Sequence, residues 1–165
     1  MVNLTFVYFF EYTIITCFTD RITKEYWKVY PEQKSQFVYA NAFTIFNFCY
    51  QVGVFISRSS LSVVKIERVH WLSILQAINF LFFLANTIWF FLENFYLMYA
   101  IMVWTGLMGG ASYVNAMYLV LEHKELQKKE KELALTLTGA LYDLGILLAS
   151  ITSLILINTA FKHMG

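Results

Sequence analysis

Two carboxylates stand inside long apolar stretches of the sequence, and they are the residues best suited to chemistry. Glu11 lies in the first apolar stretch and Asp143 in the last. An ionised side chain at the centre of a bilayer costs several kcal/mol unless it faces protein or water. A carboxyl group in such a place can bind and release a proton near neutral pH. We therefore predict that both groups handle protons or cations, and the alternative for each is a structural hydrogen bond.

Further polar side chains within the apolar stretches recur at helical spacing. They form three stripes, which are Asn47, Gln51 and Arg58; Ser73, Gln76, Asn79 and Asn86; and Thr136, Asp143 and Ser150. Residues three, four or seven apart share one face of a helix, so each stripe can turn away from lipid. The alternative use of the amides is interhelical hydrogen bonding, worth roughly 0.6 to 2 kcal/mol per contact. We predict a polar path for a small solute or proton, lined by Glu11, Asn47, Gln51 and Asp143.

Several glycines and one arginine are candidates for gating or for close packing. Gly106 and Gly110 form a G-x-x-x-G pair, which is typical of helices that approach each other closely. The alternative is a gap in the backbone that faces a solute. Arg58 ends its apolar stretch, where an arginine either gates a path or extends its side chain to the headgroups. The residues to which we assign a gating or structural role are Gly53, Arg58, Gly106, Gly109, Gly110 and Asn115.

Membrane-spanning helices must position these residues. Apolar residues make up 59% of the 165-residue chain, and its mean hydropathy is +0.57. A helix needs about 20 apolar residues to cross a hydrocarbon core of about 30 Å. Spans are predicted at about 1–18, 36–57, 71–92, 95–121 and 133–160. The expected fold is all-α, a polytopic transmembrane bundle of about five spans that forms one domain over residues 1–165.

A charged segment separates the first two spans. In it Ile22, Tyr26 and Trp27 recur at helical spacing opposite lysines. Tyrosine and tryptophan favour the headgroup layer of a membrane. We predict a short interfacial helix over about 20–30, ended by Pro31. The alternative is a packed soluble cap.

The sequence holds no catalytic or metal-binding pattern. The histidines lie in loops or in the tail without ligand spacing; they are His70, His123 and His163. Tyr142-Asp143 matches half of an intramembrane aspartyl protease motif, but that chemistry needs two aspartates, and the only other one is Asp20 in a loop. A net charge of +1 without a basic stripe excludes nucleic acid as a partner. We therefore predict that the protein is not an enzyme and needs no cofactor or metal.

The distribution of lysine and arginine predicts the orientation in the membrane. The loops 58–70 and 122–132 together hold seven such residues, against five on the other side. Cytosolic loops carry the excess of positive charge. These two loops are therefore expected in the cytosol, with the amino terminus on the same side and the carboxyl terminus across the membrane.

Four strings, in order along the chain, resemble the battenin family of lysosomal and vacuolar membrane proteins. They are VNLT from Val2, VYFFEY from Val7, YQVGVFISRSSL from Tyr50 and GLMGGASYVN from Gly106. The resemblance implies the carboxyl-terminal half of a fold like that of major facilitator transporters, in a multi-pass lysosomal or vacuolar membrane protein. It also implies transport of a small solute, with glycerophosphodiesters and basic amino acids as candidates, and an influence on organelle pH.

The chain departs from the family pattern at two places. Trp104-Thr105-Gly106 stands where the family tends to have Tyr-Glu-Gly. The family aspartate near the end aligns with Tyr142, so Asp143 lies one residue later. One residue turns a helix by about 100°, which would aim Asp143 in another direction.

The length of the chain bears on its function. The resemblance covers only one half of a transporter, and an alternating-access site lies between two halves. We therefore expect that a missing amino-terminal half or a second chain is required, alongside lipid and a small-molecule solute as partners. The alternatives are a non-transporting membrane scaffold that affects organelle pH or trafficking, and an inactive truncated fragment.

Overall fold

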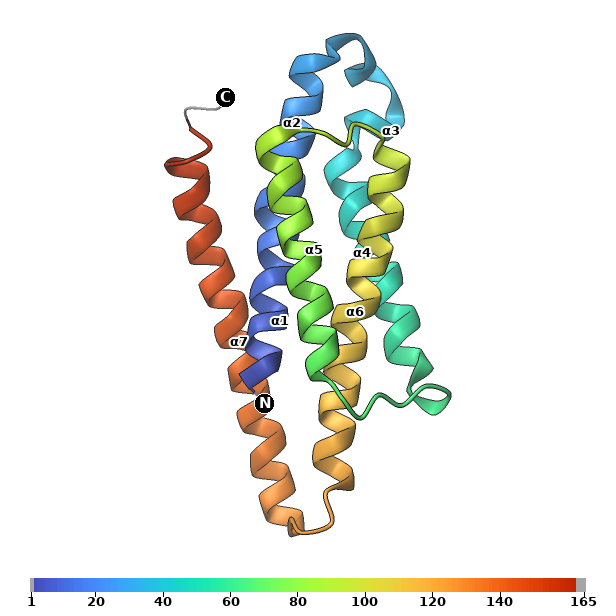
Figure 1. The fold of residues 1–165 in the computed structure, drawn as a ribbon, viewed down its shortest axis with the longest axis vertical. Helices are drawn as coiled ribbons and strands as arrows, with labels where there is room; N and C mark the ends of the chain where they lie inside the picture. Colours follow the sequence, from blue (N-terminus) through green and yellow to red (C-terminus); the bar gives the residue numbers. More distant parts are fainter. Residues whose placement is uncertain (1, 163–165) are drawn as a thin grey trace.

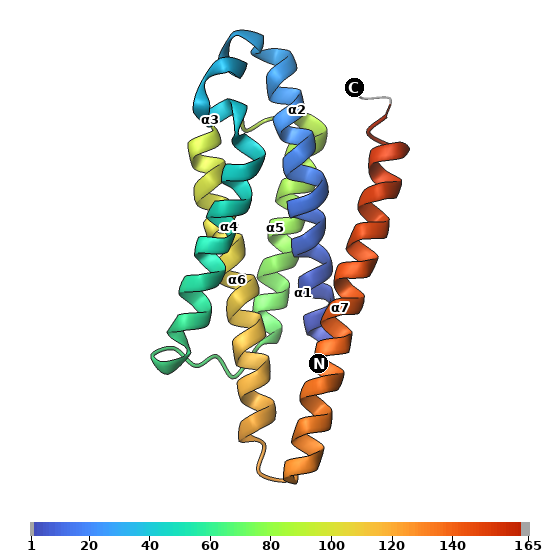
Figure 2. The same cartoon turned by 180° about the vertical axis from the view of Figure 1, so that it is seen from behind.

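The protein is a bundle of long helices. The computed structural model describes residues 2–162, which contain helices and no strand. The α-helices are α1 (Val2–Thr13), α2 (Thr19–Val29), α3 (Phe37–Ala40), α4 (Ala42–Ser59), α5 (His70–Trp89), α6 (Phe95–Glu122) and α7 (Lys128–Asn158). The predicted all-α class is confirmed. Figures 1 and 2 show α4 beside α6 and α1 beside α7, with α5 between the two pairs.

The first span is longer than expected because α1 continues directly into α2. A π-helical turn, Ile14–Phe18, joins them, and the helix runs from Val2 to Val29. The separate interfacial helix expected over about 20–30 is therefore the end of this helix. Its residues Ile22 and Tyr26 are buried in the main core, so the apolar face of α2 packs against the bundle.

Four helices are long and apolar enough to cross a membrane. They are Val2–Val29, His70–Trp89, Phe95–Glu122 and Lys128–Asn158. The remaining predicted span corresponds to α3 and α4. With 18 residues that include Asn47, Gln51 and Arg58, α4 is not among the four, but it packs along α6 more extensively than any other pair of helices in the described chain. The multi-pass membrane bundle is thus supported.

Glycines bring α4 and α6 into backbone contact. A Cβ atom on Gly106 would lie 2.1 Å from the carbonyl oxygen of Tyr50, and one on Gly53 would lie 2.1 Å from that of Val103. On Gly110 it would lie 2.1 Å from Ser57 Oγ. Any larger residue at the first two positions would push two helix backbones apart. The G-x-x-x-G pair therefore forms a close helix crossing.

Gly106→Ala is expected to lower the free energy of unfolding by about 1 to 3 kcal/mol, which is typical of overpacking against atoms that cannot move aside. Gly139→Ala in α7 is the matched control, since its Cβ would meet nothing closer than 3.8 Å. That change should stabilise the protein by up to about 1 kcal/mol, because alanine has less backbone freedom to lose on folding. Denaturation of the purified protein measures both. Equal effects of the two changes would contradict the close crossing.

The turn between α5 and α6 is held by an asparagine from the second polar stripe, which lies on α5. Asn86 is fully buried; its Oδ1 accepts from the Leu92 amide at 2.8 Å, and its Nδ2 donates to the Leu92 carbonyl at 3.4 Å. Phe90 adopts a left-handed conformation with φ of 46° in this turn. Elsewhere on the stripe, Asn79 donates to Gln76 Oε1 at 3.1 Å. These hydrogen bonds lie within α5 and between α5 and the turn that follows it.

Candidate functional site

Glu11 is enclosed by protein near the middle of the bundle. It belongs to α1, and only 1% of it is exposed. Two residues of α4 interact with its carboxylate, Tyr50 by a hydrogen bond and Arg58 by opposite charge. Within residues 2–162, the Oε1 atom has no hydrogen-bond partner. A buried oxygen without a partner calls for an explanation, because it leaves a polar atom of the carboxyl group unsatisfied.

The carboxylate fits only because α6 has a glycine opposite it. A Cβ atom on Gly109 would lie 1.7 Å from Glu11 Oε1, 2.4 Å from Cδ and 2.6 Å from Oε2. No pair of non-bonded atoms can approach so closely. Gly109 therefore forms the wall of the space that holds the carboxylate, while its neighbours Gly106 and Gly110 contact α4.

Arg58 turns back from the end of α4 across two other helices. Its guanidinium carbon lies 4.6 Å from the centroid of the Tyr113 ring on α6, a cation–π geometry. Its Nη2 atom donates to the hydroxyl of Tyr8 on α1 at 3.3 Å. Because these contacts direct the head group onto α1 and α6, Arg58 does not simply extend along the helix to the membrane surface. It places a positive charge beside the Glu11 region.

A group of tyrosines that was not predicted from the sequence lies around Glu11 and Arg58. Tyr8 stacks with Tyr12 at 6.0 Å and with Tyr142 at 5.1 Å between ring centroids. Tyr142 also meets Tyr113 edge-on at 5.7 Å. The spacing of Tyr8, Glu11 and Tyr12 by three and four residues is the signal that could have revealed the shared face. We call these four tyrosines together with Glu11, Tyr50 and Arg58 the tyrosine–arginine cluster.

The structure separates the residues of the predicted polar path. Glu11 is buried, Asn47 is half-buried, and Gln51 is exposed. Asn47 donates to the Phe43 carbonyl of its own helix at 2.9 Å. Asp143 is exposed on α7, next to Tyr142 of the cluster. Only Glu11 and Arg58 are thus brought together, with Asp143 at the margin, and the Asn47 and Gln51 face lies outside this contact.

The one-residue register of α7 decides which side chain enters the cluster. Tyr142 packs between Tyr8 and Tyr113, whereas Asp143 points to the exposed side of the helix. Of these two neighbouring residues, the aromatic ring and not the carboxylate therefore enters the cluster. Thr136 and Ser150, which share a stripe with Asp143, are exposed as well.

Asn115 has a structural role, because it joins α6 to the loop between α4 and α5. It is buried, donates to the Ala111 carbonyl at 2.9 Å and accepts from the backbone amide of Ile66 at 2.6 Å. Lys65 donates to the Tyr118 hydroxyl at 3.0 Å, and this hydrogen bond raises the pKa of Lys65. Together these contacts fix the loop between α4 and α5 across the end of α6.

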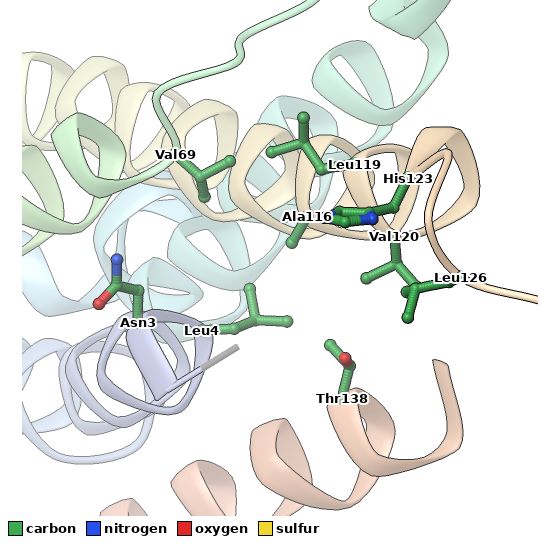
Figure 3. A pocket seen from close by; sticks show the side chains of 9 residues that line it. All are labelled: Asn3, Leu4, Val69, Ala116, Leu119, Val120, His123, Leu126 and Thr138. Atoms are coloured by element: carbon green, nitrogen blue, oxygen red, sulfur yellow. The ribbon is translucent and has the colours of Figure 1, made fainter. Parts of the chain in front are cut away.

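A cavity away from this cluster is lined almost entirely by apolar side chains. It has a volume of about 360 Å³ between the start of α1 and the facing ends of α6 and α7. Figure 3 shows Leu4, Val120 and Leu126 around it, with His123 on the α6 side. Its Thr138 hydroxyl already donates to the Ala134 carbonyl at 2.7 Å. Such a lining suits hydrocarbon rather than a polar solute.

No cluster of metal-ligating side chains occurs in the part of the chain that the structure describes. His70 is the first residue of α5, and His123 directly follows α6. His163 is outside the described residues. The chemistry available in the tyrosine–arginine cluster is therefore that of its own groups. A carboxyl group, a guanidinium and several phenol hydroxyls can exchange a proton and bind polar or charged parts of a small molecule.

Comparison with known proteins identifies the family of this helix bundle. A family model described as "CLN3 protein" matches residues 1–163. The chain belongs to the CLN3 family. Battenin of Dictyostelium discoideum is 40% identical over 158 residues, which are 96% of this chain and 36% of that protein. Protein BTN1 of Yarrowia lipolytica is 36% identical over 155 residues, or 93% of this chain and 37% of BTN1.

Membership of the CLN3 family confirms the resemblance to battenins. Battenin of Canis lupus familiaris is 32% identical over 155 residues, covering 93% of this chain and 33% of that protein. The chain thus spans about a third of the length of these curated relatives. No solved structure matches the bundle.

Proposed function

We propose that this chain is part of a battenin-like membrane transporter that moves a small solute and influences organelle pH. The observation that carries the proposal is the Glu11 carboxylate, which is buried among helices, has one oxygen without a partner and lies beside Arg58. A packing role alone would be served better by an apolar side chain, because burying an ionisable group is costly. Proton exchange at Glu11 would couple to solute bound at the tyrosine–arginine cluster.

The proposal also includes a second part of the transporter. Because the chain spans about a third of its relatives, we propose that an amino-terminal half or a second chain completes the solute path. The exposed polar side chains of α4 and α7 support this, since Gln51 and Asp143 would be costly against lipid and would instead face the other half. The family implies a lysosomal or vacuolar membrane, and glycerophosphodiesters and basic amino acids are the candidate solutes. No catalytic step is proposed.

Glu11→Gln tests the proposal, since it keeps the shape of the side chain and removes its ability to ionise. We expect proton-coupled uptake to fall at least tenfold in liposomes that contain the complete transporter. Uptake of labelled arginine and of a labelled glycerophosphodiester is measured with and without a pH gradient. Stability should change little, because the amide fits the same space beside Gly109.

The scaffold alternative makes the opposite prediction. Reversing the charges of Lys128, Lys129 and Lys131 changes the exposed loop at the start of α7 without touching the cluster. If the protein acts by binding other proteins, this change should impair organelle pH while Glu11→Gln leaves it intact. Damage from the loop variant alone would count against transport.

A further inference from the structure

A second charged site lies at the other end of the bundle from the loops 60–69 and 123–127 (Figure 1). It is a groove of about 420 Å³ between α2 and the carboxyl-terminal end of α7, which we call the lysine groove. Its lining is Asp20, Arg21, Lys24, Trp27, Lys28, Lys34, Ile157 and Phe161. Four cations and one carboxylate therefore face a space whose floor is apolar.

The charges of the lysine groove are not balanced by its carboxylates. Lys24 pairs with Asp20 at 2.6 Å. Arg21 and Lys28 both share Glu25, at 2.8 and 3.5 Å. Lys34 lies 5.0 Å from the centroid of the Trp27 ring. Among the described residues, three lysines of the groove thus lie beside two carboxylates, one of which also pairs with Arg21, and this leaves an excess of positive charge suited to an anion.

The level of the groove in the membrane indicates where the anion comes from. The helix Val2–Val29 has 28 residues and is about 42 Å long, roughly 12 Å more than the hydrocarbon core. Its polar turns are at the α2 end, so Lys24 and Lys28 lie at the height of the lipid headgroups. Trp27 is amphipathic and suits the same layer.

The apolar part of the groove continues along α7 into the membrane. Ile157 forms part of the lining, and the neighbouring Leu154 and Ile155 are exposed on the same helix. An acyl chain can follow this face while its headgroup stays among the lysines. A free phosphate ion would use only the charged part of the groove. Basic pockets between transmembrane helices are known to bind anionic headgroups in this way.

We propose that the lysine groove binds an anionic phospholipid, with its phosphodiester among Lys24, Lys28 and Lys34 and a chain along the end of α7. With the predicted orientation, this lipid belongs to the non-cytosolic leaflet. The site is separate from the tyrosine–arginine cluster and stands independently of the transport proposal, since it rests on other residues.

Native mass spectrometry of the purified full-length protein tests the site. Phosphatidylglycerol is titrated against phosphatidylcholine with the same chains. We expect phosphatidylglycerol to bind at least tenfold more tightly, and Lys24→Gln/Lys28→Gln/Lys34→Gln to abolish this preference, because each lysine near an anionic headgroup adds to its binding. The charge-conserving Lys24→Arg/Lys28→Arg/Lys34→Arg should retain it.

A matched control removes the same charge at the other end. Lys128→Gln/Lys129→Gln/Lys131→Gln should leave the preference for phosphatidylglycerol unchanged. An equal loss in this control would overturn the proposal, since binding would then follow net charge. Displacement of the lipid by millimolar inorganic phosphate would overturn it as well, because the chain would contribute nothing. All of these lysines are exposed except Lys131, which is half-buried and donates to the Leu121 carbonyl, so thermal unfolding of each variant checks that it folds.

Discussion

Gly109→Ala is expected to unfold the protein more readily and to abolish transport, although it adds only one methyl group. The new Cβ would lie 1.7 Å from Glu11 Oε1, so the carboxylate or α6 must move. Overpacking usually costs about 1 to 3 kcal/mol, and here it also displaces a buried ionisable group from its partners. We expect a loss of about 3 kcal/mol in the free energy of unfolding, measured by denaturation of the purified protein.

A double-mutant cycle separates this cause from a general loss of packing. In a Glu11→Ala background the carboxylate is absent, so Gly109→Ala should leave the free energy of unfolding almost unchanged. Gly106→Ala is the matched control, because its Cβ clashes with the Tyr50 backbone and its cost should be the same in both backgrounds. Contacting residues typically show coupling of about 0.5 to 3 kcal/mol in such cycles. Absence of coupling between positions 11 and 109 would refute the assigned contact.

The sequence predicted the helices and the buried acid because both follow from local patterns. Apolar stretches of sufficient length identified the spans, and a carboxylate within one of them identified Glu11. The close crossing of α4 and α6 followed from the spacing of Gly106 and Gly110. Periodicity also placed Gln76 and Asn79 on the buried face of α5.

Local sequence patterns could not predict which residues form the tyrosine–arginine cluster, because that depends on how the helices are arranged in space. The polar stripe of α4 contains Asn47, Gln51 and Arg58, yet only the long side chain of Arg58 reaches α1 and α6. Tyr8 and Tyr12 were overlooked because aromatic residues in an apolar stretch were counted as apolar, although both share a helix face with Glu11. The continuity of α1 with α2 was not predicted for a related reason, since the charged turns of α2 continue a helix whose apolar side packs on the bundle.

Arg58→Gln is expected to reduce transport at least tenfold, because it removes the positive charge beside Glu11 and the link between three helices. The guanidinium stacks on Tyr113 and donates to Tyr8, so its loss frees both rings. A lysine keeps the charge but cannot stack as a planar group, and Arg58→Lys should retain only part of the activity. Uptake of labelled solute into liposomes, together with thermal unfolding, measures both variants.

Changes at Tyr113 show whether the stacked ring matters in itself. Tyr113→Phe keeps the face on which the guanidinium rests and should transport almost as well as the unmodified protein. Tyr113→Leu removes the ring, and it should resemble Arg58→Lys, since a cation–π contact is worth about 0.5 to 2 kcal/mol. Full activity of Arg58→Gln, or equal damage from the two Tyr113 variants, would show that Arg58 acts only at the membrane surface. The graded order Tyr113→Phe, Tyr113→Leu and Arg58→Gln would instead mean that charge and ring position act on Glu11 together.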